Sequence, residues 1–166
     1  MIVLIVLMLL FAVALNLVGC NHTVEIEEPA ADSELQTETT MPQADPSKWG
    51  LTLNAENVTD TGLTILCHHS GGENVAELNT GSYYVIQKSE EAGWVDVEYL
   101  PHEYDICWTA EAWIIRQEGT TQWDVNWEWL YGKLSAGEYR IGKEIMNFRG
   151  PGDYDREMIY ANFEIK

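Results

Sequence analysis

The sequence predicts an all-β domain for residues 49–166, in the form of an antiparallel sandwich or barrel. Three observations predict it. Short runs rich in β-branched and aromatic residues recur along this region, and glycine-containing turn sequences separate them. No apolar period of 3.6 residues lasts longer than two turns, so long helices are not expected.

The expected strands are short, and turn signals bound most of them. The first two end at Asp60-Thr-Gly62 and at Ser70-Gly71-Gly72. A hairpin-length loop that ends at Gly93 separates the next two, and two Trp-rich segments follow on either side of Gly119. The expected strands cover residues 51–58, 63–69, 83–87, 94–98, 106–115, 122–130, 138–141 and 159–165.

Alternation of apolar and polar side chains is clearest in the expected strand 122–130. Trp123, Val125, Trp127 and Trp129 alternate with polar residues, which places three indoles on one face of one strand. An aromatic sheet face can stack on sugars, so these three tryptophans are candidate ligand-binding residues. Packing of the same rings in the sandwich core is the alternative, and we favour it because large rings bury much apolar area.

Residues 1–19 have the composition of an export signal. The run from Met1 to Leu15 is apolar without a break, which is slightly short for a membrane span but typical of a secretory hydrophobic region. Leu17-Val18-Gly19-Cys20 resembles the lipobox of bacterial lipoproteins. The resemblance implies that the Cys20 thiol carries diacylglycerol and that cleavage occurs just before it. The run lacks the usual basic residues, and an uncleaved anchor helix is the alternative.

Residues 20–48 have the composition of a flexible acidic linker. They contain seven acidic residues, three prolines and a single basic residue, Lys48. Such a stretch cannot bury enough apolar surface to offset the entropy of ordering it, so we expect a self-repelling spacer. A helical spacer over residues 30–39 is less favoured because no apolar stripe is present. The domain is therefore expected to be exported and lipid-anchored at the outer face of the bacterial cell membrane.

The charge balance excludes nucleic acid as a partner. The chain has 27 acidic and 9 basic residues, which gives a net charge of −18. A surplus of this size repels phosphate backbones. The expected partners are the membrane, through the lipid anchor, and an unidentified surface protein or glycan.

Several short motifs follow one another across residues 49–166. They are Trp49-Gly-Leu-Thr-Leu53, Asn57-Val-Thr59, Gly62-Leu63, Gly81 with Tyr83, Gly93-Trp94, Trp108-Thr-Ala110, Trp127-Glu-Trp129 with Tyr131-Gly132, Leu134-Ser-Ala-Gly137, Tyr139-Arg-Ile-Gly142 and Gly152-Asp153-Tyr154-Asp155. Their order resembles a bacterial immunoglobulin-like domain of exported lipoproteins. The resemblance implies an immunoglobulin-like β-sandwich in which Tyr139 packs under a corner and its hydroxyl bonds to nearby backbone. It implies no settled activity and no catalytic residues.

Cys67 and Cys107 form an even pair once Cys20 carries lipid. An exported domain meets an oxidising compartment, and Trp108 beside the second cysteine loosely resembles the arrangement around an immunoglobulin disulfide. The pair is therefore a candidate disulfide. Free thiols remain equally open, because sequence spacing does not fix the separation of the two Cα atoms.

The sequence gives little support for metal binding or catalysis. Cys67-His68-His69 places only two metal-ligating side chains on one strand face, and the pair Asp153 and Asp155 is typical of a turn. No nucleophile elbow, zinc-protease motif or phosphate-binding loop occurs, and no metal or cofactor is expected.

The expected function is that of a non-enzymatic, lipid-anchored surface protein with an interaction or scaffold module. A carbohydrate-binding module that uses the Trp-rich face is the alternative. A hydrolase that uses acidic pairs such as Glu111 with Glu128 is a weaker third reading, because so acidic a chain produces such pairs without function.

Overall fold

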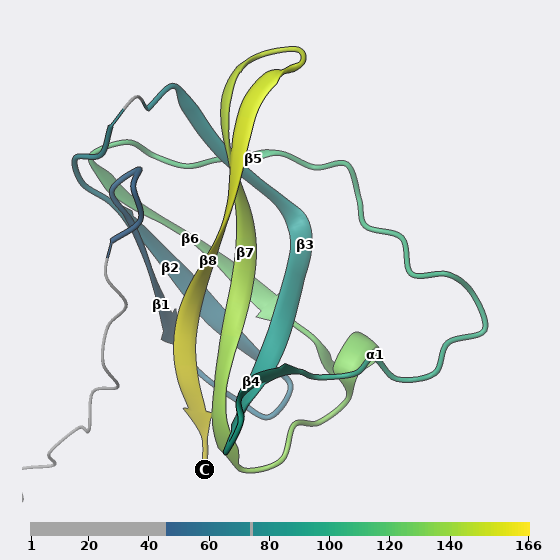
Figure 1. The fold of residues 1–166 in the computed structure, drawn as a ribbon. Helices are drawn as coiled ribbons and strands as arrows, with labels where there is room; N and C mark the ends of the chain where they lie inside the picture. The colour runs from purple at the N-terminus through teal and green to yellow at the C-terminus, as the bar shows by residue number, and fades with distance from the viewer. Residues whose placement is uncertain (1–45, 74) are drawn as a thin grey trace, which may run out of the picture. The chain divides into compact units, whose positions relative to one another are not determined.

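The computed structural model describes residues 46–73 and 75–166 (Figure 1). The elements in chain order are β1 (Leu51–Glu56), β2 (Gly62–His69), β3 (Glu77–Glu90), β4 (Gly93–Asp96), β5 (Trp113–Ile114), β6 (Gly119–Asn126), α1 (Glu128–Tyr131), β7 (Gly137–Gly150) and β8 (Asp153–Ile165). No helix in these residues is long and apolar enough to span a membrane. The expected export signal, Cys20 and nearly all of the expected linker lie outside the described residues.

The strands form two antiparallel sheets, and the predicted all-β sandwich is confirmed. One sheet has the order β1-β2-β6, and the other has the order β4-β3-β7-β8 with the short β5 paired to β3. Contacts between β1 and β8 join the two sheets along one side. On the other side, β6 is the edge of its sheet, and the irregular connection 97–112 swings outward before it returns to β5 (Figure 1).

The core lies between the sheets and is built from alternate side chains of the strands. This alternation is the period of two that the sequence showed, because successive side chains of a strand point to opposite faces. Burial of these side chains from water is the main source of stability. Among the fully buried apolar residues are Leu51, Ile65, Cys67, Leu78, Ile86, Ile141 and Ile145.

Tyr139 takes the position that the family resemblance implies. Its side chain is buried, and its hydroxyl donates a hydrogen bond of 2.9 Å to the carbonyl oxygen of Ser135. Its ring stacks on Phe163 with the centroids 5.5 Å apart. The ring of Trp127 also packs against Phe163, with the centroids 5.6 Å apart, and its Nε1 donates to the carbonyl oxygen of Asp60 at 3.0 Å. The Tyr139 hydroxyl and the Trp127 N–H therefore each have a hydrogen-bond acceptor.

The expected strand 122–130 is wrong beyond Asn126. The backbone of Trp127 leaves the extended region at φ −113° and ψ 4°, and α1 begins at the next residue. The Asn126 side-chain oxygen accepts the N–H of Glu128 at 3.1 Å, and the Trp127 carbonyl accepts the N–H of Leu130 at 2.9 Å. Because the chain turns here, the three tryptophans of this segment do not share one strand face.

Two further segments differ from the expected strands, and in both the difference depends on cross-strand partners. Only residues 113–114 of the expected strand 106–115 pair with a neighbour, so local β-propensity did not become a strand where no partner strand is available. Conversely, the β7–β8 hairpin runs past the core to a turn at residues 151–152. Arg149 binds both Asp153 and Asp155 there, at 2.8 and 2.9 Å, so polar pairing across the hairpin replaces apolar alternation.

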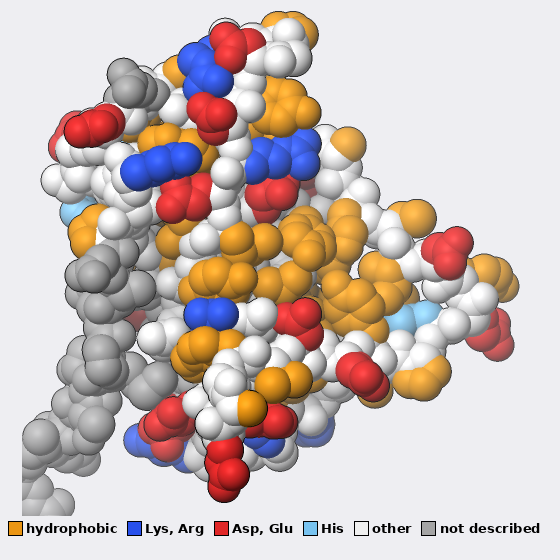
Figure 2. Space-filling view, in the orientation of Figure 1, with side chains coloured by type: hydrophobic (Ala, Val, Ile, Leu, Met, Phe, Trp, Pro, Cys, Tyr) orange, Lys and Arg blue, Asp and Glu red, His pale blue; other side chains and the backbone are white. Residues whose placement is uncertain are grey.

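The outer face of the larger sheet carries a band of apolar side chains, visible across the middle of the molecule in Figure 2. The guanidinium of Arg140 lies 4.7 Å from the ring centre of Trp94 and 4.0 Å from that of Tyr160. Gly142 permits this packing, since a Cβ at that position would lie 2.7 Å from the Tyr160 ring. The side chains of this face therefore cover one another.

Candidate binding site

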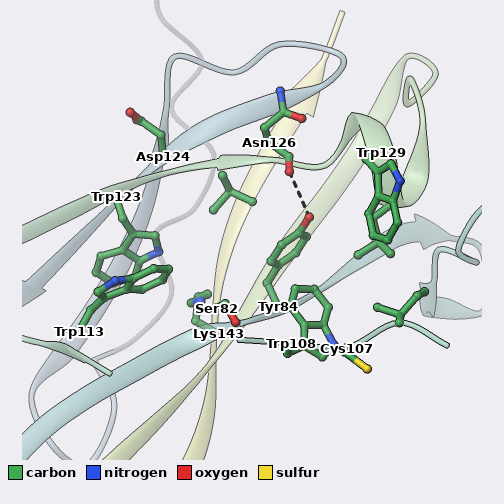
Figure 3. A pocket seen from close by; sticks show the side chains of 13 residues that line it. Ser82, Tyr84, Cys107, Trp108, Trp113, Trp123, Asp124, Asn126, Trp129 and Lys143 are labelled. Carbon is green, nitrogen blue, oxygen red and sulfur yellow. Dashed lines mark hydrogen bonds between the residues drawn. The ribbon is translucent and has the colours of Figure 1, made fainter. Parts of the chain in front are cut away.

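A pocket of about 280 Å³ lies between the two sheets, on the side where β6 faces β3 and β7 (Figure 3). Aromatic side chains dominate its wall. They are Tyr84 of β3, Trp108 of the connection 97–112, Trp113 of β5, Trp123 of β6 and Trp129 of α1. The only basic side chain in the lining is Lys143 of β7. The pocket thus combines an aromatic wall with a single amine.

Lys143 is held at the pocket by an irregularity in the larger sheet. The register between β3 and β7 shifts between Thr80 and Tyr84. The carbonyl oxygens of Gly81 and Tyr83 fall within this shift, and both accept hydrogen bonds from Lys143 Nζ, the second at 2.9 Å. Lys143 follows the inward register of Ile141 and Ile145, which explains why so polar a side chain is only 1% exposed.

The amine of Lys143 lies among rings rather than carboxylates. Its Nζ is 5.3 Å from the ring centre of Trp113 and 5.9 Å from that of Trp123, within the range of cation–π attraction. In the described part of the chain, no Asp or Glu forms an ion pair with it. Burial lowers the pKa of Lys143 to about 8. Lys143 is therefore a buried amine whose charged form lacks a carboxylate partner among the described residues.

Asp124 lines the pocket but does not neutralise Lys143. It alternates with Trp123 and Val125 on β6, so its side chain belongs to the opposite face of the strand. There its carboxylate accepts a hydrogen bond of 2.7 Å from the Thr64 hydroxyl on the neighbouring strand. The only carboxylate in the lining is thus directed to another partner.

Trp123 has an unsatisfied donor. Its ring is half-buried against the core, and its Nε1 is shielded from solvent. No hydrogen-bond acceptor among the described residues lies within reach of this N–H. A buried donor without a partner costs free energy, so this atom differs from the satisfied Nε1 of Trp127.

The remaining aromatic side chains are fixed by ring contacts. Trp108 packs edge-on against Tyr84, with the ring centroids 5.2 Å apart. The Tyr84 hydroxyl donates to the carbonyl oxygen of Asn126 at 3.3 Å (Figure 3), and burial raises its pKa to about 12, so it remains a neutral donor. Trp129 lies at the rim, 68% exposed, with its ring 4.3 Å from that of His102. The rim therefore offers an indole to solvent.

The structure separates the three tryptophans that the sequence singled out. Trp123 and Trp129 both line the pocket, whereas Trp127 is fully buried in the core and has no part in it. Sequence reasoning missed Lys143 and Trp113. The signal for Lys143 was its place in the alternation with Ile141 and Ile145, which predicts an inward side chain.

The candidate disulfide is not formed in the structure, where Cys67 and Cys107 are both free. Cys67 faces the core from β2, and burial raises its pKa to about 12. Cys107 is exposed on the connection 97–112 and lines the pocket. The reason for the difference is that Cys107 lies in an irregular segment, not on a strand that faces β2 across the core.

The residues weighed as metal ligands have other partners. His68 points outward and lies 3.3 Å from the Thr120 hydroxyl, while His69 is buried and its Nδ1 accepts the backbone N–H of Glu118 at 2.9 Å. Asp153 and Asp155 bind Arg149. In the described ranges, no group of three or more His, Cys, Asp or Glu side chains is arranged to hold a metal ion.

The sandwich of two antiparallel sheets with a tyrosine at its corner defines an immunoglobulin-like module. The model of one protein family, the bacterial Ig-like domain, matches residues 45–164, and the chain belongs to this family. No curated protein and no solved structure matches the chain significantly. Domains of this kind are generally non-catalytic, and membership indicates an interaction or scaffold module.

Proposed function

We propose that this protein is an exported, lipid-anchored surface protein of a bacterium, and that its Ig-like domain is a non-catalytic binding module. The single observation that carries the binding role is the aromatic pocket beside β6. Small-molecule sites are concave and mostly apolar, with few polar groups that fix orientation, and this pocket has that composition. Trp129, which is 68% exposed, adds a large apolar surface at the rim.

The anchor rests on Leu17-Val18-Gly19-Cys20, which resembles a lipobox. Two acyl chains on Cys20 would hold the protein firmly, at about 0.8 kcal/mol per buried CH₂ group. We expect a labelled fatty acid fed to expressing bacteria to appear on the wild-type protein and on Cys107→Ala, but not on Cys20→Ala. Equal labelling of Cys20→Ala would contradict the anchor.

The binding role is tested on the bacterial surface itself. Purified full chain in detergent is mixed with bacterial wall fragments and sedimented. We expect Trp129→Ala and Trp113→Ala to reduce the bound fraction, because both indoles line the pocket. Tyr154→Ala is the control, since Tyr154 is exposed on the β7–β8 hairpin and does not line the pocket. Equal binding by all three variants and the wild type would contradict a role of the pocket.

Carbohydrate binding is the second candidate function, and the two exposed indoles favour it. Trp113 is 38% exposed and Trp129 is 68% exposed, so both can offer a ring face to a sugar. On a glycan array, the full chain is expected to give signals that Trp129→Ala loses and Tyr154→Ala keeps. An array without signal, from protein whose circular dichroism shows a folded β structure, would contradict the glycan.

A further inference from the structure

Two hydrogen-bond donors in the pocket have no acceptor of their own. A charged lysine has three N–H groups, and two of those on Lys143 are used by the carbonyl oxygens of Gly81 and Tyr83. The amine also lies within cation–π distance of Trp113 and Trp123, and no carboxylate of the described residues forms an ion pair with it. One N–H of Lys143 thus has no hydrogen-bond acceptor among the described residues, and its charge has no carboxylate partner there.

The second donor is the indole N–H of Trp123. It is shielded from solvent and has no partner among the described residues. The Lys143 amine is 5.9 Å from the centre of the same indole ring. Both donors belong to side chains that line the pocket, and a carboxylate has two oxygens, so one such group placed between them can accept a hydrogen bond from each.

We infer that the pocket binds a small carboxylate, whose oxygens accept hydrogen bonds from Lys143 Nζ and Trp123 Nε1. This inference rests on the proposed role of the pocket as a binding site. A carboxylate supplies the missing counter-charge and the missing acceptor together. A phosphate carries more charge and more acceptor oxygens than one amine and one indole can satisfy, and a cationic ligand would meet the Lys143 ammonium.

The remaining wall of the pocket limits the size of the group that carries the carboxylate. Trp108, Trp129 and Tyr84 present ring surfaces, and the volume of about 280 Å³ lies just below the usual range of about 300–1,000 Å³ for small-molecule sites. A ligand with a single ring is therefore the size that fits this pocket. A uronic acid at a glycan terminus and an arylacetic acid share this chemistry, a single ring that bears a carboxylate.

The test compares two acids with neutral molecules that have the same ring but no carboxylate. Full chain in detergent is titrated by calorimetry with D-glucuronate and D-glucose, and with phenylacetate and 2-phenylethanol. We expect at least one acid to bind at least about tenfold more tightly than its neutral counterpart, as a charge-assisted hydrogen bond requires. Preference for glucuronate assigns the sugar source, and preference for phenylacetate assigns the aromatic source.

Two variants attribute this preference to the two donors. Lys143→Met is expected to remove the difference between acid and alcohol. Trp123→Phe keeps a ring but removes the N–H, and is expected to weaken acid binding about five- to tenfold. Trp94→Phe is the matched control, because Trp94 lies on the outer face against Arg140. Should Lys143→Met fail to fold, Trp123→Phe still decides the question.

Three outcomes would overturn the inference. They are neutral ligands that bind as tightly as the acids, acid binding that Trp123→Phe leaves unchanged, and no binding of any of the four ligands. If wall fragments still bind the wild type and not Trp129→Ala, only the carboxylate is wrong and the pocket keeps its proposed role. If wall binding is also unchanged by Trp129→Ala, the proposed function itself fails.

Discussion

Two aromatic regions of the same sandwich differ in whether their buried polar atoms have partners. In the core region, the Tyr139 hydroxyl bonds to Ser135 and the Trp127 indole bonds to Asp60. In the pocket, the Trp123 indole has no partner among the described residues and Lys143 has no carboxylate. The first arrangement is what stability alone favours. The second arrangement costs stability, and departures of this kind from a fully satisfied interior are expected at functional sites.

The sharpest contrast in stability is between Trp127 and Trp129. We expect Trp127→Ala to lower the free energy of unfolding by about 3–5 kcal/mol, because it removes a fully buried ring and leaves a cavity. Trp129→Ala should lower it by about 0.5 kcal/mol or less, since this ring is largely exposed. Urea unfolding followed by circular dichroism measures both. Similar losses in the two variants would erase the distinction between core and pocket.

The next largest effect is a pH dependence from Lys143. Its pKa is about 8 in the fold and 10.5 in the unfolded chain. Between these values the unfolded state binds the additional proton, so raising the pH stabilises the fold through this residue. The stability of the wild type relative to Lys143→Met should therefore rise by about 3 kcal/mol between pH 7.5 and about 10.5.

The comparison of two variants isolates this effect from other titrations. Tyr84, Cys107 and Asp124 are the other titratable residues that line the pocket, and both proteins contain them. Burial shifts the pKa of Cys67 in the opposite direction, from 9.0 to about 12. This shift lowers the stability of both proteins above pH 9, because the unfolded thiol then loses its proton first. A difference between the two proteins that stays flat across this window would contradict a buried, unpaired amine.

A smaller effect is expected at the corner of the core. Tyr139→Phe keeps the stacked ring but removes the hydroxyl that bonds to Ser135, so it should cost about 1 kcal/mol. Tyr154→Phe, at an exposed position, serves as the control and should be neutral. Thermal unfolding of the pair measures the difference, and a neutral Tyr139→Phe would show that the corner bond adds nothing.

The smallest effect is expected at Cys107. Because this thiol is free and exposed, Cys107→Ala should change stability by less than about 0.5 kcal/mol under non-reducing conditions. Loss of a disulfide to Cys67 would instead cost about 2–5 kcal/mol. Urea unfolding without reductant distinguishes the two, and a loss in the larger range would restore the disulfide.

The sequence predicted the core better than the pocket, for physical reasons. The core depends on local alternation and on the corner at Tyr139, which are visible in the order of residues. The pocket depends on the turn of the backbone at Trp127 and on the register shift near Gly81, which frees carbonyl oxygens for Lys143. Alternation continues in the sequence through Trp129, so nothing in it marks where β6 ends.

The most direct test of the account records both regions in one spectrum. In ¹H–¹⁵N spectra of the full chain, the indole signals of Trp123 and Trp127 are assigned with the two Trp→Phe variants. Titration with the acid that binds more tightly, glucuronate or phenylacetate, should move the Trp123 indole proton downfield to a plateau and leave that of Trp127 in place. A Trp123 signal that does not move at saturation, or one that moves no further than that of Trp127, would contradict it.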